Sequence, residues 1–186
     1  VQVVGQKSYP YHDKRPQDED IDGGLLCQAG IHAVRFIEHT AGVRVKEIQA
    51  FETKLGNPVQ GDLRMAACYL CDLENGGIAS LAANYLNQKG FGMWGNEMLR
   101  IFGTKGFVQA TQGGQNTRLI LGEQDLGEID TSAPDSDYFD MITESILGNT
   151  PMPLTTEQEL HPTRVVIRAK EYADKHYSSK LSSSDV

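Results

Sequence analysis

Four polar side chains within residues 23–42 recur at a spacing that could do chemistry. They are Gln28, His32, Arg35 and His39, at offsets of 0, 4, 7 and 11 residues. This spacing predicts one polar stripe on a helix. A histidine exchanges protons near neutral pH, and glutamine or arginine can hydrogen-bond hydroxyl or carboxylate groups. An ordinary solvated helix face has the same spacing, so that alternative stays open at this point.

The residues before this helix favour a ligand site. Gly23 and Gly24 weaken the start of the helix and allow another backbone or a ligand to come close. The preceding loop supplies donors suited to hydroxyl or carboxylate groups, namely His12, Lys14 and Arg15. In this interpretation His32 is the group that moves a proton.

Hydrophobic spacing predicts the elements that position these residues. Leu26, Ala29, Ala33, Phe36, Ile37 and Ala41 form an apolar stripe on a helix over 23–42, with Asp22 as N-cap and Gly42 as stop. Strands are expected over 1–9, 45–55, 65–74, 77–86, 97–103, 106–112 and 117–123. Asn75-Gly76 predicts a hairpin between two of them.

Two further helices are expected at the end of the chain. One covers 136–149 and the other about 156–178, with Thr156 and Glu159 as a capping box and Pro162 as a first-turn residue. The sequence therefore predicts an α+β fold, with an open, mostly antiparallel sheet of about six or more strands and helices on one face. We expect a single domain over 1–178 and a polar tail over 179–186.

The predicted hairpin is apolar on both faces. Met65, Ala67, Tyr69, Cys71 and Leu73 point one way, and Ala66, Cys68 and Leu70 point the other. A sheet with water on one side alternates more cleanly. We therefore expect the face without helices to be covered by a second copy of the chain, with coverage by long loops as the alternative.

Two motifs look functional but lie in the wrong context. Residues 90–95, GFGMWG, match Gly-x-Gly-x-x-Gly, yet they join two strands instead of opening a helix, so we expect a mobile loop in which Trp94 packs or reaches a ligand. Cys68 and Cys71 are three apart on a strand and face opposite sides, so we predict no metal site.

Composition excludes several classes of function. A net charge of −8 without a basic patch disfavours nucleic acid as a partner. No stretch approaches the roughly 20 apolar residues of a membrane span. Three cysteines are too few for a secreted disulfide scaffold, which favours a cytoplasmic protein.

The segment 23–32, GGLLCQAGIH, resembles the Gly-Gly-x-x-x-Asp-x-Gly-x-His motif of the glucose–fructose oxidoreductase / inositol dehydrogenase / MocA family. Further segments resemble the family in the same order: VKEIQAFETK, DLENGGIASLAANY, EMLRIFGTKGFVQA and PLTTEQEL. The resemblance spans nearly all of the chain. It covers only the C-terminal half of such enzymes, which binds substrate and builds oligomers.

The resemblance implies an NAD(P)-dependent oxidoreductase acting on a sugar, polyol or related hydroxy compound. The family binds NAD or NADP mainly through an N-terminal Rossmann domain that this sequence lacks. We therefore expect a fragment or a descendant that lost that half, inactive alone and binding no cofactor by itself. His32 takes the catalytic acid/base position, and Gly23 and Gly24 give the nicotinamide room.

Two positions depart from the family pattern. The aspartate of the motif falls at Gln28, and the acidic residue that often follows the histidine falls at Arg35. An amide can bind a hydroxyl group but carries no proton at neutral pH. The expected substrate-binding residues are Gln28, Arg15, His12, Lys14 and Arg35. The alternative function is a non-catalytic sugar-binding or oligomerisation module.

Overall fold

The computed structural model describes residues 1–130, 132 and 137–183 of the chain. Its strands are β1 (Gln2–Ser8), β2 (Val45–Thr53), β3 (Ala66–Leu73), β4 (Ile78–Asn84), β5 (Met98–Phe102), β6 (Gly106–Thr111), β7 (Asn116–Leu121) and β8 (Gln124–Glu128). Its helices are α1 (Ile31–Arg35), α2 (Tyr138–Ile146) and α3 (Thr156–Ser183). Short 3₁₀ turns cover Lys89–Phe91 and Gln112–Gly114.

The strands form one open sheet with the order β2-β3-β4-β1-β5-β6-β7-β8. Neighbouring strands are antiparallel except β1 and β4, which are parallel. The Asn75-Gly76 hairpin is present, and Gly76 has the positive φ of 76° that its turn requires. The predicted fold class is therefore confirmed, and β8 is a strand that the sequence analysis missed.

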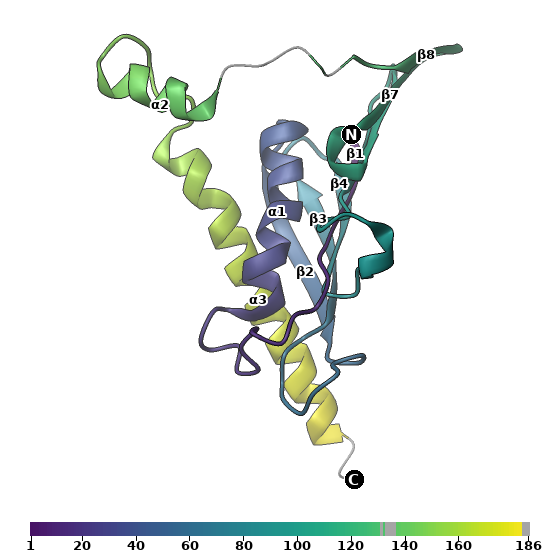
Figure 1. Ribbon diagram of the computed structural model, residues 1–186, viewed down its shortest axis with the longest axis vertical. Helices are drawn as coiled ribbons and strands as arrows, with labels where there is room; N and C mark the ends of the chain where they lie inside the picture. Colours follow the sequence, from purple (N-terminus) through teal and green to yellow (C-terminus); the bar gives the residue numbers. More distant parts are fainter. Residues whose placement is uncertain (131, 133–136, 184–186) are drawn as a thin grey trace.

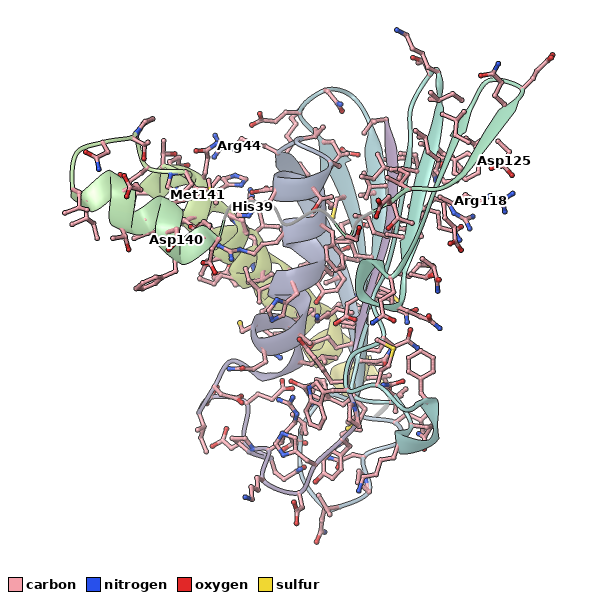
Figure 2. The ribbon with its side chains drawn as sticks, turned by 45° about the horizontal axis from the view of Figure 1, so that its top comes forward. His39, Arg44, Arg118, Asp125, Asp140 and Met141 are labelled. Atoms are coloured by element: carbon pink, nitrogen blue, oxygen red, sulfur yellow. The ribbon has the colours of Figure 1, made fainter. Side chains whose placement is uncertain are left out.

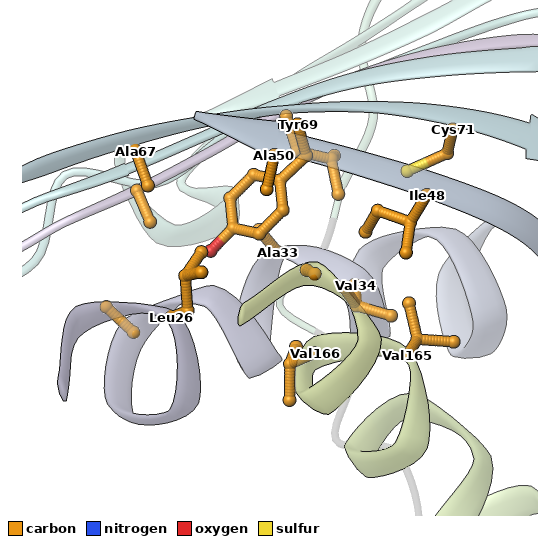
Figure 3. Packing of buried hydrophobic residues seen from close by; sticks show 14 of the residues in the cluster. Leu26, Ala33, Val34, Ile48, Ala50, Ala67, Tyr69, Cys71, Val165 and Val166 are labelled. Carbon is orange, nitrogen blue, oxygen red and sulfur yellow. The ribbon is translucent and has the colours of Figure 1, made fainter. Parts of the chain in front are cut away.

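The core lies between this sheet and two helices on one of its faces (Figure 1). α3 packs on β2, and α1 packs on β1 and β4. The inward residues of β3 are those predicted: Ala67, Tyr69, Cys71 and Leu73 are all buried, as is Met65 just before the strand. Tyr69 projects from the sheet toward the helices, beside Leu26 and Ala33 (Figure 3).

The first helix (24–40) is less regular than predicted. One π-helical turn precedes α1 (Leu26–Gly30) and another follows it (Phe36–Thr40), so the segment is not the uniform α-helix expected. In the second turn, Ala41 N donates to Phe36 O at 3.0 Å, which is an i to i+5 bond. The apolar stripe still faces the sheet, because its residues are buried or half-buried.

Two predictions about α3 were wrong in detail. Its capping box consists of Thr155 and Gln158, one residue earlier than expected: Gln158 N donates to Thr155 Oγ1 at 3.2 Å, and Thr155 N donates to Gln158 Oε1 at 2.8 Å. Glu159 is instead paired with Arg35. Pro162 lies inside the helix and is buried, so it does not restart it.

Pro162 has no N–H for the carbonyl of Gln158, the residue four positions earlier. His39 Nε2 lies 3.3 Å from that carbonyl oxygen, and Figure 2 shows His39 on the side of the first helix that faces α2 and the start of α3. The proline is thus accommodated by a contact from the neighbouring helix.

The end of the chain also differs from expectation. α3 continues through Ser183, beyond the predicted end at residue 178. Residues 184–186 of the predicted tail lie outside the described residues. No residue of α2 is buried. None of the described helices combines the length and apolar character of a membrane span.

Candidate functional site

A cluster of polar and aromatic side chains lies where the two parallel strands end. Beyond Ser8 at the end of β1, Tyr9 N donates to Asn84 O of β4 at 2.9 Å. The carboxyl ends of parallel strands commonly carry the ligand site of an open sheet. Here Tyr9 contacts rings from two other segments: His32 of α1, with centroids 6.3 Å apart, and Trp94, with centroids 6.2 Å apart.

The loop that carries Trp94 is fastened to the same end of the sheet. Asn87 Nδ2 donates to the carbonyl oxygens of Met93 and Trp94, both at 3.2 Å. Asn96 N donates to Ser8 O at 3.0 Å. These hydrogen bonds tie down a loop that was predicted to be mobile, and they place Trp94 beside Tyr9, so the tryptophan packs on a neighbouring ring.

His32 has an environment suited to a neutral imidazole. The His32 side chain is exposed, yet partial burial of its ring lowers its pKa below the ordinary value of 6.5, and the nearby charges of Lys7 and Arg35 lower it further. Glu97 acts in the opposite sense and is the smallest of these influences. At neutral pH the histidine is therefore uncharged and can accept a proton.

Lys7 and Glu97 form an ion pair beside this histidine. Both side chains are largely buried, with exposed fractions of 14% and 18%. Lys7 Nζ also lies 5.0 Å from the centroid of the Tyr9 ring. Gly95 makes room for the carboxylate, because a Cβ at that position would stand 2.3 Å from Glu97 Oε1.

Sequence reasoning did not identify Lys7, Tyr9 or Glu97. A signal for Lys7 was present, because it follows Val3 and Gly5 on the inward face of β1, where a lysine needs a partner. Glu97 reaches the pair only through the pairing of β1 with β5, and no local pattern marks it.

Of the predicted loop residues, His12 is the one that joins this cluster. Its ring centroid lies 6.2 Å from that of Trp94, and both residues line an open pocket. Arg15 lies outside this cluster. Its guanidinium carbon stacks 3.7 Å from the centroid of the Tyr85 ring, and its Nη1 donates a hydrogen bond to Tyr85 Oη at 2.9 Å. Lys14 is exposed.

The polar residues of the first helix do not share one site. His32 faces Tyr9, whereas Arg35 forms an ion pair with Glu159 of α3. Gln28 is exposed, and its Nε2 donates to the carbonyl oxygen of Asp22 at 3.0 Å. Neither contact places Gln28 or Arg35 against His32, although the charge of Arg35 acts on it.

Gly23 and Gly24 are required by the chain's own packing. Their φ angles are 79° and 65°, in the left-handed region. A Cβ on Gly24 would stand 2.5 Å from the Glu19 carboxylate, and one on Gly23 would stand 2.6 Å from Cys27 Cβ. These contacts explain the two glycines whether or not a cofactor approaches them.

The Gly-x-Gly-x-x-Gly segment lacks the structural context that binds the phosphates of a dinucleotide. The Gly-x-Gly-x-x-Gly segment leads into β5 and not into the N-terminus of a helix. Among the residues that the structure describes, no group of three or more His, Cys, Asp or Glu side chains could hold a metal ion. Cys68 is exposed and Cys71 is buried, on opposite faces of β3 as predicted.

The sheet face opposite the helices carries exposed apolar side chains. Leu70 is 59% exposed and Ile78 is 55% exposed. Beyond β1, Phe102 of β5 and Phe107 of β6 lie together on this face, with ring centroids 5.3 Å apart. Far along the same sheet, Arg118 and Asp125 form an ion pair on β7 and β8 (Figure 2).

Known proteins were compared with this chain by sequence and by structure. No curated protein matches the sequence. Among solved structures, a protein from Thermotoga maritima described as an oxidoreductase has a TM-score of 0.81 and 26% identity, over 93% of this chain and 52% of its own. The aldose-aldose oxidoreductase from Caulobacter crescentus has a TM-score of 0.78 and 18% identity, over 94% of this chain and 53% of its own.

A third similar structure is the UDP-N-acetylglucosamine 3-dehydrogenase GnnA from Acidithiobacillus ferrooxidans. Its TM-score is 0.71 at 13% identity, over 92% of this chain and 54% of its own. The chain thus spans about half the length of the solved structures it matches. The sequence model described as the GFO/IDH/MocA C-terminal domain matches residues 1–109. The chain therefore belongs to the GFO/IDH/MocA family and has the fold of its C-terminal domain.

Proposed function

We propose that the chain is the substrate-binding part of a longer NAD(P)-dependent oxidoreductase that acts on a sugar, polyol or related hydroxy compound. The observation that carries the proposal is His32, a neutral imidazole beside Lys7 and Tyr9 at the end of the parallel strands. Support also comes from the names of similar structures, which include an aldose-aldose oxidoreductase and a protein solved with NAD.

In this proposal His32 accepts the proton of a substrate hydroxyl group. Oxidation of an alcohol also removes a hydride, and the nicotinamide that takes it is held by another part of the longer protein. In this proposal the chain supplies the proton acceptor and the groups that bind hydroxyls, which agrees with a Gly-x-Gly-x-x-Gly segment that leads into a strand and not into a helix. His12 and Trp94 can contact the substrate from the pocket they share.

The other predicted site residues contribute less to substrate binding in this proposal. Gln28 can bind a hydroxyl group only if it leaves the Asp22 carbonyl, and Arg15 and Arg35 hold Tyr85 and Glu159. Lys14 stays a candidate for substrate contact. Gly23 and Gly24 stay candidates for the approach of the nicotinamide. We propose a cytoplasmic protein, inactive when reduced to these 186 residues.

The test is turnover in the full-length protein. A panel of sugars and polyols is screened with NAD and with NADP by absorbance of the reduced nicotinamide, beside a His32→Ala variant. We expect turnover with at least one substrate and a loss of 10²-fold or more in the variant. Turnover that persists in His32→Ala would refute the role of this histidine.

A non-catalytic sugar-binding or oligomerisation module is the second candidate. It is favoured by Gln28, which replaces a motif carboxylate and bonds to Asp22, so it provides no proton-carrying partner for His32. Binding of a sugar or cofactor without turnover of any substrate would support this module.

We also propose that the sheet face bearing Leu70 and Ile78 joins copies of the chain. Leu70 and Ile78 are exposed apolar side chains on a sheet face without helices, and such side chains are typical of interfaces between copies of a chain. Leu70→Glu should convert the assembly to monomers in light scattering after size-exclusion chromatography. An unchanged mass for Leu70→Glu, or a monomeric wild type, would contradict this proposal.

A further inference from the structure

A groove next to the His32 site has the ion pair of Lys7 and Glu97 in its wall. It has a volume of about 420 Å³, within the range of small-molecule sites. The first helix contributes Phe36 and Thr40 on one side, and the turn after β6 contributes Gly113 and Gly114 on the other. Lys7 links the groove to the catalytic histidine, because its charge acts on His32.

We infer that this groove binds two adjacent hydroxyl groups of a neutral sugar or polyol between Lys7 and Glu97, and discriminates against anionic sugars. The inference rests on the proposed function and names the substrate class within it. It places the reacting carbon near His32 and the remainder of the substrate in the groove.

The hydrogen-bonding capacity of the pair carries the argument. An ammonium group has three donors and a carboxylate has two acceptor oxygens. Lys7 Nζ pairs with Glu97 Oε1. The other oxygen, Oε2, lies toward the groove turn, because a Cβ built on Gly113 would be 3.7 Å from it. One hydroxyl can accept from Lys7 while its neighbour donates to Glu97 Oε2.

The charge of the pair excludes anions. Lys7 and Glu97 neutralise one another, so the groove offers no net positive charge to a carboxylate or phosphate. An anionic ligand bound by Lys7 would face the Glu97 carboxylate as a like charge in a partly buried site. Phe36 supplies an apolar surface for the C–H groups of a sugar ring.

The turn after β6 (Gln112–Gly114) has a backbone conformation that is unfavourable for a residue with a side chain. Gln112 has a φ of 52°, in the left-handed region that a residue with a side chain seldom adopts. Gln112 Oε1 accepts from Asn116 Nδ2 at 2.7 Å, which fastens the turn. The turn therefore keeps Gly113, which has no side chain to fill the groove, next to Glu97.

The test is an NMR titration of the ¹⁵N-labelled chain. The neutral probes are D-glucose, D-galactose and myo-inositol, and the anionic probes are D-glucuronate and D-galacturonate. We expect saturable shifts of the Gly113 and Gly114 amides with at least one neutral probe, and at least tenfold weaker binding of its uronate counterparts. No saturable shift with any neutral probe, or equal binding of the uronates, would overturn the inference.

Glu97→Gln should reverse the preference. Neutral sugars should bind at least tenfold more weakly, and uronates more tightly, because the charge of Lys7 is no longer neutralised. Glu123→Gln makes the same charge change at an exposed turn and should leave binding as in the wild type. An unchanged preference in Glu97→Gln would overturn the inference.

A second variant is needed because Glu97→Gln leaves the largely buried charge of Lys7 without a counter-charge and can unfold the chain. Thr40→Phe narrows the groove from an exposed position at the end of the first helix and leaves the ion pair intact. It should abolish the shifts, and full binding would overturn the inference. If the full-length protein turns over a substrate and needs His32, but no sugar binds in the groove, only this inference is refuted. If sugars bind in the groove but no substrate is turned over, only the proposed function is refuted.

Discussion

Replacing Glu52 by glutamine should remove the fall in stability that the wild type shows as the pH rises from 5 to 8. The Glu52 side chain, on β2, is only 3% exposed. Its Oε2 accepts from Lys170 Nζ of α3 at 3.0 Å, and Lys170 also pairs with Glu19. Burial raises the pKa of Glu52 from 4.5 to about 7, against the attraction of Lys170 and with some help from Glu19.

The sign and size of the effect follow from this pKa. Between pH 4.5 and about 7 the folded chain holds a proton on Glu52 that the unfolded chain has released. Stability therefore falls as the pH rises through this interval and levels off above it. At about 1.4 kcal/mol for each pH unit, the total loss is about 3 kcal/mol in the free energy of unfolding.

The assay is urea denaturation of the chain at pH 5, 6, 7 and 8, followed by circular dichroism. Wild type should lose stability across the series, whereas Glu52→Gln, which has no titrating proton at residue 52, should show no such fall. Glu74→Gln removes the same charge at an exposed site and should keep the wild-type slope. Equal slopes for the wild type and Glu52→Gln would refute the reasoning.

Two further predictions concern packing and capping. Gly30→Ala should destabilise by about 2 kcal/mol despite the better helix propensity of alanine, because the new Cβ would stand 1.8 Å from Tyr69 Oη. Tyr69→Phe in the same chain should recover at least half of that loss, and no recovery in urea denaturation would contradict the clash. Thr155→Ala should cost about 1 kcal/mol by loss of the α3 cap, whereas an equal cost for Thr156→Ala would show that the cap is misassigned.

The sheet was predictable because its signals are local. Alternating segments and the Asn75-Gly76 turn fix strands and hairpins over a few residues, and the two faces of β3 follow from its alternation. The π-helical turns were not predictable in this way. The first helix packs Gly30 against Tyr69 of β3, and no local sequence pattern shows this contact between residues far apart in the chain.

The candidate site was predictable only in part. His32 and His12 were recognised from their chemistry and the family motif, and both lie in the cluster around Tyr9 and Trp94. The ion partners of Arg35 and Lys7 lie 124 and 90 residues away along the chain, so spacing could not reveal them. The adjacent threonines at the start of α3, Thr155 and Thr156, both have the spacing of a capping box. The ion pair of Glu159 with Arg35 agrees with a cap formed by Thr155 and Gln158.

The most direct test of the account is the pH dependence of kcat/KM for substrate oxidation by the full-length protein. The account predicts a rate that rises with pH and levels off above an apparent pKa below 6.5, because partial burial and the charge of Lys7 lower the pKa of His32. This rise with pH should be absent in His32→Ala, and its apparent pKa should move toward 6.5 in Lys7→Met. An unchanged rise with pH in His32→Ala would contradict the assignment of His32 as the proton acceptor.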